Sequence, residues 1–406
     1  MFLSITAPSF FDSDPLSIKN NPADFASGGT IPLSNYKLLA NTSLLTAIGL
    51  PLFFIIAGMS TFYALGYLEK KEIKIRKYIL LRFIRIIVPY VIGIFTYISL
   101  LVFLELTNKG IIYSSFFAFY PTYFVGFYGF GGNFSVFGHH LWFLVILFVL
   151  TLATVHLFAY LRREKFRSGF SKIASFFTKP FTIYLLPIPI VVMEVIHSLY
   201  ISFLPRIGGW DFFSYIFFLF YGYLFAYDKQ FRKAFKKNFI IAIILGLVSM
   251  GILIFSNIYY FDLIWLIPGF QNIEIMFLLF RVFYSWSVLI VILFLGEKYL
   301  NKKSKAVKTL NDFVLPFYII HFVIVSIVGF YVVQLDFLVI SEYLLIFIIS
   351  LAIIVPLLFI IRELNALSFI FGMKVSKEKS IARFFKKKKT TTDESLIEES
   401  KIEKNQ

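Results

Sequence analysis

The sequence predicts an all-α polytopic integral membrane protein with about nine transmembrane helices. Hydrophobic residues make up 59% of the 406 residues and charged residues only 15%. Soluble domains are about 45–50% apolar and about 25% charged, so the composition excludes them. The mean hydropathy of +0.82 agrees. The apolar residues also form runs of spanning length, and the loops between these runs alternate in charge.

Nine apolar runs reach the roughly 17–25 residues that a spanning helix needs. In chain order they are 43–67, 79–106, 140–160, 182–202, 211–227, 238–258, 275–296, 312–334 and 338–361. The run 211–227 is the shortest of them, so its helix would cross the bilayer with little tilt.

Alternate loops carry most of the basic residues. Loops 68–78, 161–181, 228–237 and 297–311 contain five, six, five and five Lys or Arg residues. The loops between them hold few, with only Lys109 in 107–139 and only Arg206 in 203–210. The positive-inside rule therefore predicts cytoplasmic basic loops, a cytoplasmic C-terminus and residue 1 outside. The net charge of +16 is explained by these loops, and no nucleic-acid partner is expected.

Three regions follow from this topology: an extracytoplasmic segment 1–42, a transmembrane bundle 43–362, and a basic cytoplasmic tail 363–406 that is expected to be disordered. In the tail, Lys386–Lys389 are expected to lie against anionic lipid head groups. Residues 1–42 contain no basic region followed by an apolar core, so the expectation is that a tenth helix precedes residue 1.

Four segments resemble, in this order, the signature segments of the acyltransferase-3 family of membrane O-acyltransferases. They are "PLFFIIAGMSTFYAL" (51–65), "RKYILLRFIRIIVPYVIG" (76–93), "HLWFLVILFVL" (140–150) and "LPFYIIHFVIVSIVGFYVV" (315–333). The segments "FFDSDPLSIKNN" (10–21) and "IRELNALSFIFGMK" (361–374) are similar to the glucan-modifying branch. The resemblance implies ten helices in the bacterial inner membrane and transfer of an acyl group from cytoplasmic acyl-CoA to an extracytoplasmic hydroxyl. The family's first helix carries an arginine and a histidine, and its place lies before residue 1.

Ionisable groups inside predicted membrane helices are costly and are therefore candidates for function. Arg82 and Arg85 lie three residues apart on one face at the cytoplasmic end of 79–106. The resemblance implies that they bind the acyl-CoA donor, and the alternative is that they snorkel and mark topology.

His140 stands at the outer boundary of 140–160, within the family motif, next to Trp142. Imidazole titrates near neutrality, so His140 can serve as the base or bind the hydroxyl, whereas the alternative is a polar cap. We expect Trp142 to contact the acceptor, although a tryptophan also suits the membrane interface. The glycine- and aromatic-rich stretch 126–138 is expected to be a flexible loop over the site.

Further candidates lie deeper in the chain. Arg281 follows Glu274 by seven residues, about 10 Å along a helix, and the two are expected to face the interior as a pair, with a catalytic or a structural role. His321 lies near mid-membrane as a catalytic group or a neutral hydrogen-bonding one. Glu194 and His197 share a helix face and are expected to line the acceptor mouth.

The sequence thus predicts a membrane O-acyltransferase with acyl-CoA as donor and a glycan or another hydroxyl compound as acceptor. The alternatives are a transporter or flippase without covalent chemistry, or an inactive, truncated acyltransferase-like protein. The absence of cysteine excludes thiolate nucleophiles, and the scattered histidines lack ligand spacing, so no metal is expected.

Overall fold

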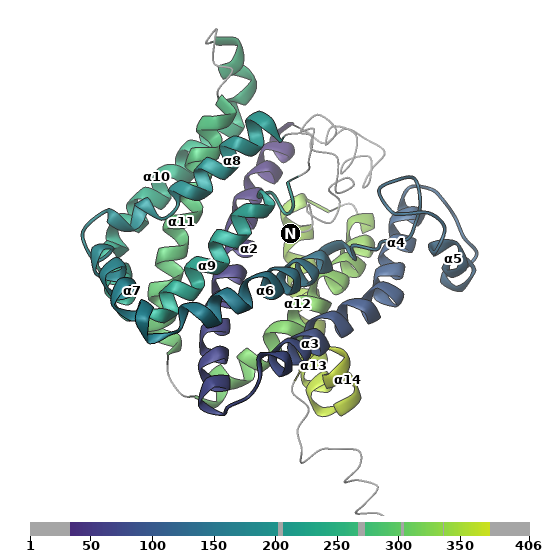
Figure 1. Ribbon diagram of the computed structural model, residues 1–406. Coiled ribbons are helices and arrows are strands. Elements are labelled where there is room, and N and C mark those ends of the chain that lie inside the picture. Colours follow the sequence, from purple (N-terminus) through teal and green to yellow (C-terminus); the bar gives the residue numbers. More distant parts are fainter. Residues whose placement is uncertain (1–32, 202–205, 267–272, 302–303, 336, 374–406) are drawn as a thin grey trace, which may run out of the picture.

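The computed structural model describes residues 33–201, 206–266, 273–301, 304–335 and 337–373, with only the backbone described for 33–46, 256–266, 273, 274 and 339. Within these ranges the regular elements are helices, and the β-bridges are isolated pairs (Figure 1). In chain order the elements are α2 (Leu33–Lys70), α3 (Ile75–Phe95), α4 (Tyr97–Asn108), α5 (Phe116–Tyr123), η2 (His139–Leu141), α6 (Trp142–Leu161), α7 (Glu164–Phe176), η3 (Thr182–Leu185), α8 (Ile188–Tyr200), α9 (Phe212–Tyr227), α10 (Gln230–Leu266), α11 (Ile273–Leu300), α12 (Lys305–Val332), η4 (Val333–Leu335), α13 (Val339–Glu363) and α14 (Asn365–Ile370).

Eight helical segments of the described chain are long and apolar enough to cross a membrane, and they cover eight of the nine predicted runs. The ninth run forms α9, whose 16 residues span about 24 Å against a hydrocarbon core of about 30 Å. The prediction of an all-α polytopic membrane protein is therefore confirmed.

The predicted run 79–106 is divided into two helices. Thr96 leaves the helical conformation with φ −117° and ψ −92°, which ends α3 and starts α4 at Tyr97. Gly93 makes room at this break, because a Cβ there would lie 2.3 Å from the Tyr97 hydroxyl oxygen. The break therefore positions the Tyr97 side chain against the end of α3.

The bundle has two chemically different ends. The basic end carries the four Lys- and Arg-rich loops, 68–78, 161–181, 228–237 and 297–311. The opposite end carries α5, η2 and the turns that join α4 to α6, α8 to α9 and α12 to α13.

Helices α2 and α9 cross at unusually short range. A Cβ on Gly58 of α2 would lie 2.0 Å from the Leu219 carbonyl oxygen, and a Cβ on Gly222 of α9 would lie 2.0 Å from the Ile55 carbonyl oxygen. Small residues allow backbones to approach in this way inside membranes, where dispersion contacts between helices supply much of the stability. Figure 1 shows α2 and α9 side by side in the bundle.

Replacement of Gly58 by alanine is expected to destabilise the protein by about 1–3 kcal/mol, because the added methyl group forces the two backbones apart. Gly49→Ala on the same helix is the matched control, since a Cβ at Gly49 would meet no atom of another described element within 4 Å. Thermal unfolding of both variants in the same detergent measures the difference. Equal midpoints for the two variants would show that the close crossing does not contribute to stability.

The folded bundle continues beyond the predicted boundary at residue 362. Helix α14 follows α13 after Leu364 and packs on α3. Gly372 ends this segment with a positive φ of 68°, and its carbonyl oxygen accepts a hydrogen bond from Arg85 Nε at 3.0 Å. The first part of the expected tail, 363–373, is therefore folded against the bundle. Residues 374–406 and 1–32, including most of the expected extracytoplasmic segment, lie outside the described residues.

Candidate functional site

The described candidate residues fall into three groups. His140 and His321 lie together at the opposite end, and we call them the histidine pair. Glu194 and His197 belong to a polar network at the same end, beside Arg281. Arg82 and Arg85 lie on α3 toward the basic end.

A tight turn at Gly138 and His139 positions His140, the first histidine of the pair. Gly138 and His139 have φ values of 67° and 46°. The one-turn helix η2 begins at His139, and α6 begins directly after it. A positive φ is uncommon for a residue with a side chain, so this turn is held by its surroundings. It places the His140 ring against α12, where the ring stacks on Phe322 at a centroid distance of 4.4 Å. The rings of His140 and His321 are 5.8 Å apart between centroids.

The hydrogen bonds of His140 fix its tautomer. Its Nε2 lies 3.0 Å from the Ile319 carbonyl oxygen, which can only accept, so Nε2 carries the hydrogen in the neutral ring. Nδ1 then holds a lone pair, and this buried nitrogen has no partner among the described residues. His140 is therefore arranged to accept a proton at Nδ1.

His321 has the reverse arrangement. Its Nδ1 lies 3.0 Å from the Phe317 carbonyl oxygen one helical turn earlier, so Nδ1 donates and Nε2 holds the lone pair. Its ring also stacks on Phe317 with an interplanar angle of 5°. The two rings of the pair thus present different nitrogen atoms as acceptors.

Two tyrosines complete this group. The Tyr318 hydroxyl donates to the His140 carbonyl oxygen and ties α12 to η2. The Tyr97 hydroxyl, at the start of α4, is buried with no partner among the described residues. Tyr97 and Tyr318 are close enough to interact electrostatically. A free hydroxyl donor therefore accompanies the free acceptor of His140.

The aromatic segment 110–138 contains no charged residue and leads directly into η2. It is held in place, since Tyr123 donates to the Ile94 carbonyl at 3.0 Å and Tyr128 donates to Glu105 at 2.7 Å. Burial and the Glu105 carboxylate raise the pKa of Tyr128 above its usual value, so it keeps the proton that it donates. The Tyr128 ring contacts His139 at 4.9 Å. The predicted loop 126–138 is therefore anchored on both α3–α4 and η2.

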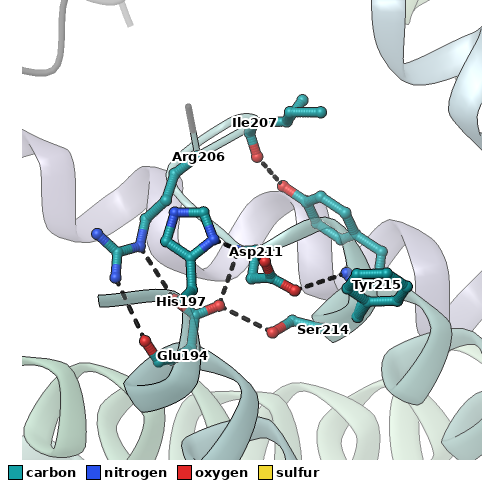
Figure 2. A network of polar contacts seen from close by, with 8 residues as sticks. Glu194, His197, Arg206, Ile207, Asp211, Ser214 and Tyr215 are labelled. Atoms are coloured by element: carbon teal, nitrogen blue, oxygen red, sulfur yellow. Dashed lines mark hydrogen bonds and ion pairs between the residues drawn. The ribbon is translucent and has the colours of Figure 1, made fainter. Parts of the chain in front are cut away.

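The polar network links α8, α9 and the turn between them (Figure 2). Glu194 is fully buried, and its Oε1 accepts from Ser214 Oγ and from the Asp211 backbone N–H, each at 2.8 Å. Its Oε2 accepts from Arg206 Nε at 3.2 Å. Each oxygen of this carboxylate is thus satisfied, as a charge in a buried position requires.

His197 lies one turn after Glu194 and contacts a second carboxylate. Its Nδ1 is 2.7 Å from Asp211 Oδ2, and both side chains are buried. Asp211 also caps α9, because Oδ1 accepts from the Phe213 backbone N–H at 2.8 Å. The shared face predicted for Glu194 and His197 therefore points into one network with Asp211 (Figure 2).

Arg281 extends from α11 toward this network. Its guanidinium lies over the ring of Trp210 at 4.5 Å from the centroid, and Glu194 is close enough to interact with it electrostatically. The side chain of Glu274 lies outside the described residues, so its pairing with Arg281 stays a prediction.

An aromatic wall stands between the network and the histidine pair. Tyr215 stacks on Phe54 at 4.5 Å, Phe54 contacts Phe143 at 5.1 Å, and Phe143 contacts Tyr318 at 5.4 Å between centroids. Trp142 belongs to this wall: it is buried and lies 6.4 Å from Tyr215 between ring centroids. Trp142 is therefore a neighbour of both polar groups.

Arg82 and Arg85 have different surroundings. Arg82 is partly buried and donates from Nε to the Tyr78 hydroxyl at 3.0 Å and from a terminal nitrogen to Thr61 Oγ1 at 3.2 Å. Arg85 is exposed and donates to Gly372. Arg82 is thus fixed between α2 and α3, whereas Arg85 connects α3 to the segment after α14.

Sequence reasoning missed five polar members of these groups: Tyr97, Arg206, Asp211, Ser214 and Tyr318. The sequence around two of them, Asp211 and Arg206, indicated a role. Asp211 directly precedes an apolar run, which is the pattern of a helix N-cap, and Arg206 is the one basic residue in a base-poor loop. Within the described residues, no group of three or more His, Asp and Glu side chains is arranged to hold a metal ion.

Comparison with protein families identifies the family of the chain. The model of the acyltransferase-3 family, described as an acyltransferase domain, matches residues 21–360, which is more than half of the chain. This agrees with the resemblance carried by the segments at 51–65, 76–93, 140–150 and 315–333. No curated protein and no solved structure matches the chain.

Proposed function

Because the chain belongs to the acyltransferase-3 family, we propose that it is a membrane O-acyltransferase that moves an acyl group from cytoplasmic acyl-CoA to a hydroxyl of an extracytoplasmic acceptor such as a glycan. The observation that carries this proposal is the free Nδ1 of His140 beside His321 and the free Tyr97 hydroxyl. Acyl transfer to an alcohol needs a base for the hydroxyl proton and a donor for the developing oxyanion. This group offers both.

The reaction proceeds by direct attack. His140 Nδ1 takes the proton of the acceptor hydroxyl, and the oxygen forms a bond to the thioester carbonyl carbon. The carbonyl oxygen gains negative charge, which the Tyr97 hydroxyl stabilises as a hydrogen-bond donor. The carbon–sulfur bond then breaks, and the proton held by His140 passes to the departing CoA thiolate. The products are the ester and free CoA.

The proposed direction of acyl transfer across the membrane is inferred from the distribution of Lys and Arg residues between the two ends of the bundle. The positive-inside rule places the basic end in the cytoplasm, so the C-terminus is cytoplasmic and the histidine pair lies toward the outer surface of the bacterial inner membrane. Acyl-CoA is anionic, and its phosphates suit arginine side chains at the basic end. Arg82, held by Tyr78 and Thr61, is the better ordered of the two candidates for donor binding.

Replacement of Arg82 by alanine is expected to raise the KM for acyl-CoA about tenfold or more, because a hydrogen bond to a charged group contributes about 1.5–3 kcal/mol. Arg76→Ala is the control, since Arg76 is an exposed arginine on the same helix. Steady-state kinetics of both variants measure the difference. A KM within twofold of wild type in Arg82→Ala would remove this residue from donor binding.

The proposal is tested first in cells. Surface or periplasmic glycans are expected to carry an ester-linked acyl group, seen as added mass that is lost on treatment with base. Deletion of the encoding gene is expected to remove this added mass, and expression of the full chain is expected to restore it. Mass spectrometry of the isolated glycans gives the result. Unchanged glycans, together with loss of a transported solute, would favour a transporter instead.

A further inference from the structure

Two side chains at the opposite end have hydrogen-bond donors without acceptors among the described residues. Arg281 makes no hydrogen bond to any described residue; its described contacts are the Trp210 ring and electrostatic interactions with Glu194, Tyr215 and Arg206. The indole Nε1 of Trp210 is buried and also lacks a partner in the described part of the chain, and Trp210 is 0% exposed. Leaving a buried hydrogen-bond donor without an acceptor costs folding free energy, and the cost is largest for a charged group.

Glu194, the described carboxylate that interacts electrostatically with Arg281, makes its hydrogen bonds to other groups. Glu194 accepts from Arg206, Ser214 and the Asp211 backbone, and its charge is paired with Arg206 at 3.2 Å. Asp211 in turn is engaged by His197. Among the described carboxylates of the network, Glu194 and Asp211 are therefore paired with groups other than Arg281.

The turn 206–211 packs closely against the guanidinium, which only glycine permits at this position. Gly209 has a φ of 82°, and a Cβ there would lie 2.9 Å from a terminal nitrogen of Arg281. A Cβ on the preceding residue, Gly208, would lie 2.8 Å from the Trp142 ring, two residues after His140. The same turn thus touches Arg281 on one side and the wall beside the histidine pair on the other.

We propose that Arg281 and Trp210 bind a single oxyanion, a phosphate or carboxylate group that is carried by an acceptor molecule or by a lipid head group. The guanidinium supplies charge and several N–H donors, and the indole supplies one further N–H. Because the turn that contacts Arg281 also reaches Trp142, two residues after His140, we assign this oxyanion to the acyl acceptor, whose hydroxyl would extend past the aromatic wall to His140. This last assignment rests on the proposed function, whereas the binding of an oxyanion does not.

Inorganic phosphate is the first probe, added to the full chain in nanodiscs of phosphatidylcholine. The expected result is a saturable rise of the thermal unfolding midpoint that chloride at equal ionic strength does not give. Arg281→Met is expected to abolish the phosphate-dependent rise. Trp210→Phe, which keeps an aromatic ring but removes the N–H, is expected to weaken apparent phosphate affinity about tenfold. A wild-type rise equal to that with chloride, or variants that keep the wild-type response, would overturn the proposal.

Two further arms identify the source of the oxyanion. A stronger rise with glucose 6-phosphate than with glucose supports a soluble acceptor, and a rise when phosphatidylglycerol replaces part of the phosphatidylcholine supports a lipid head group. Release of CoA thiol from acetyl-CoA, measured on the same samples, separates this site from the reaction. Phosphate binding without thiol release would leave the site intact and contradict the proposed function, and thiol release without phosphate binding would do the reverse.

Discussion

Replacement of His140 by alanine is expected to lower the rate of acyl transfer by about 100-fold or more, the usual contribution of a general base. The reason is the fixed tautomer: Nε2 is committed to the Ile319 carbonyl, so Nδ1 is the acceptor that the proposed reaction uses. The chain contains no cysteine, so a thiol reagent detects released CoA without a background from the protein. Thiol release with acetyl-CoA and succinyl-CoA as donors and soluble glucans as acceptors measures the rate.

His140→Asn and His139→Ala serve as comparisons. Asparagine can replace the hydrogen bond to Ile319 but cannot take a proton near neutral pH, so we expect it to fold like wild type and to remain as slow as the alanine variant. His139 lies outside the pair and contacts Tyr128, so its replacement is expected to have a smaller effect on the rate. An asparagine variant with wild-type activity would exclude proton transfer at this position.

Replacement of Glu194 by alanine is expected to destabilise the protein by about 3–5 kcal/mol, the cost of removing one partner from a buried ion pair. The change would leave Arg206, Ser214 and the Asp211 backbone N–H without their acceptor. Thermal unfolding in detergent or nanodiscs measures this loss.

Glu194→Gln gives a graded comparison at the same position. Its amide oxygen can still accept from Ser214 and Asp211, and only the charge is lost, so the destabilisation should be smaller than for alanine. Equal stability of wild type and the alanine variant would mean that the network does not join α8 to α9.

The sequence was informative about the helices because apolar runs of spanning length are local features. It was less informative about the division of 79–106, since the break falls at Thr96 and neither proline nor glycine occupies that position. The short α9 was also visible in the sequence as the shortest run. The folding of 363–373 onto α3 was not, because it depends on contacts between distant parts of the chain.

In the candidate site, too, individual residues could be predicted from the sequence, whereas their contacts depend on the three-dimensional fold. His140 and His321 were each selected through family segments, but the facing of their rings depends on the η2 turn and α12. Glu194 and His197 follow from helix spacing, whereas their partners Arg206 and Asp211 lie in the next turn and could be assigned only in three dimensions. Tyr97 gave no signal, because a tyrosine in an apolar run is common and its isolation arises from the helix break.

The central claim is transfer across the membrane from the basic end to the histidine pair, and proteoliposomes with sorted orientation test it most directly. Labelled acyl-CoA is supplied only on the side of the basic end, and a glucan acceptor is enclosed only on the other side. The account predicts labelled ester on the enclosed glucan and free CoA on the donor side. Ester formation only when donor and acceptor share one side would contradict it.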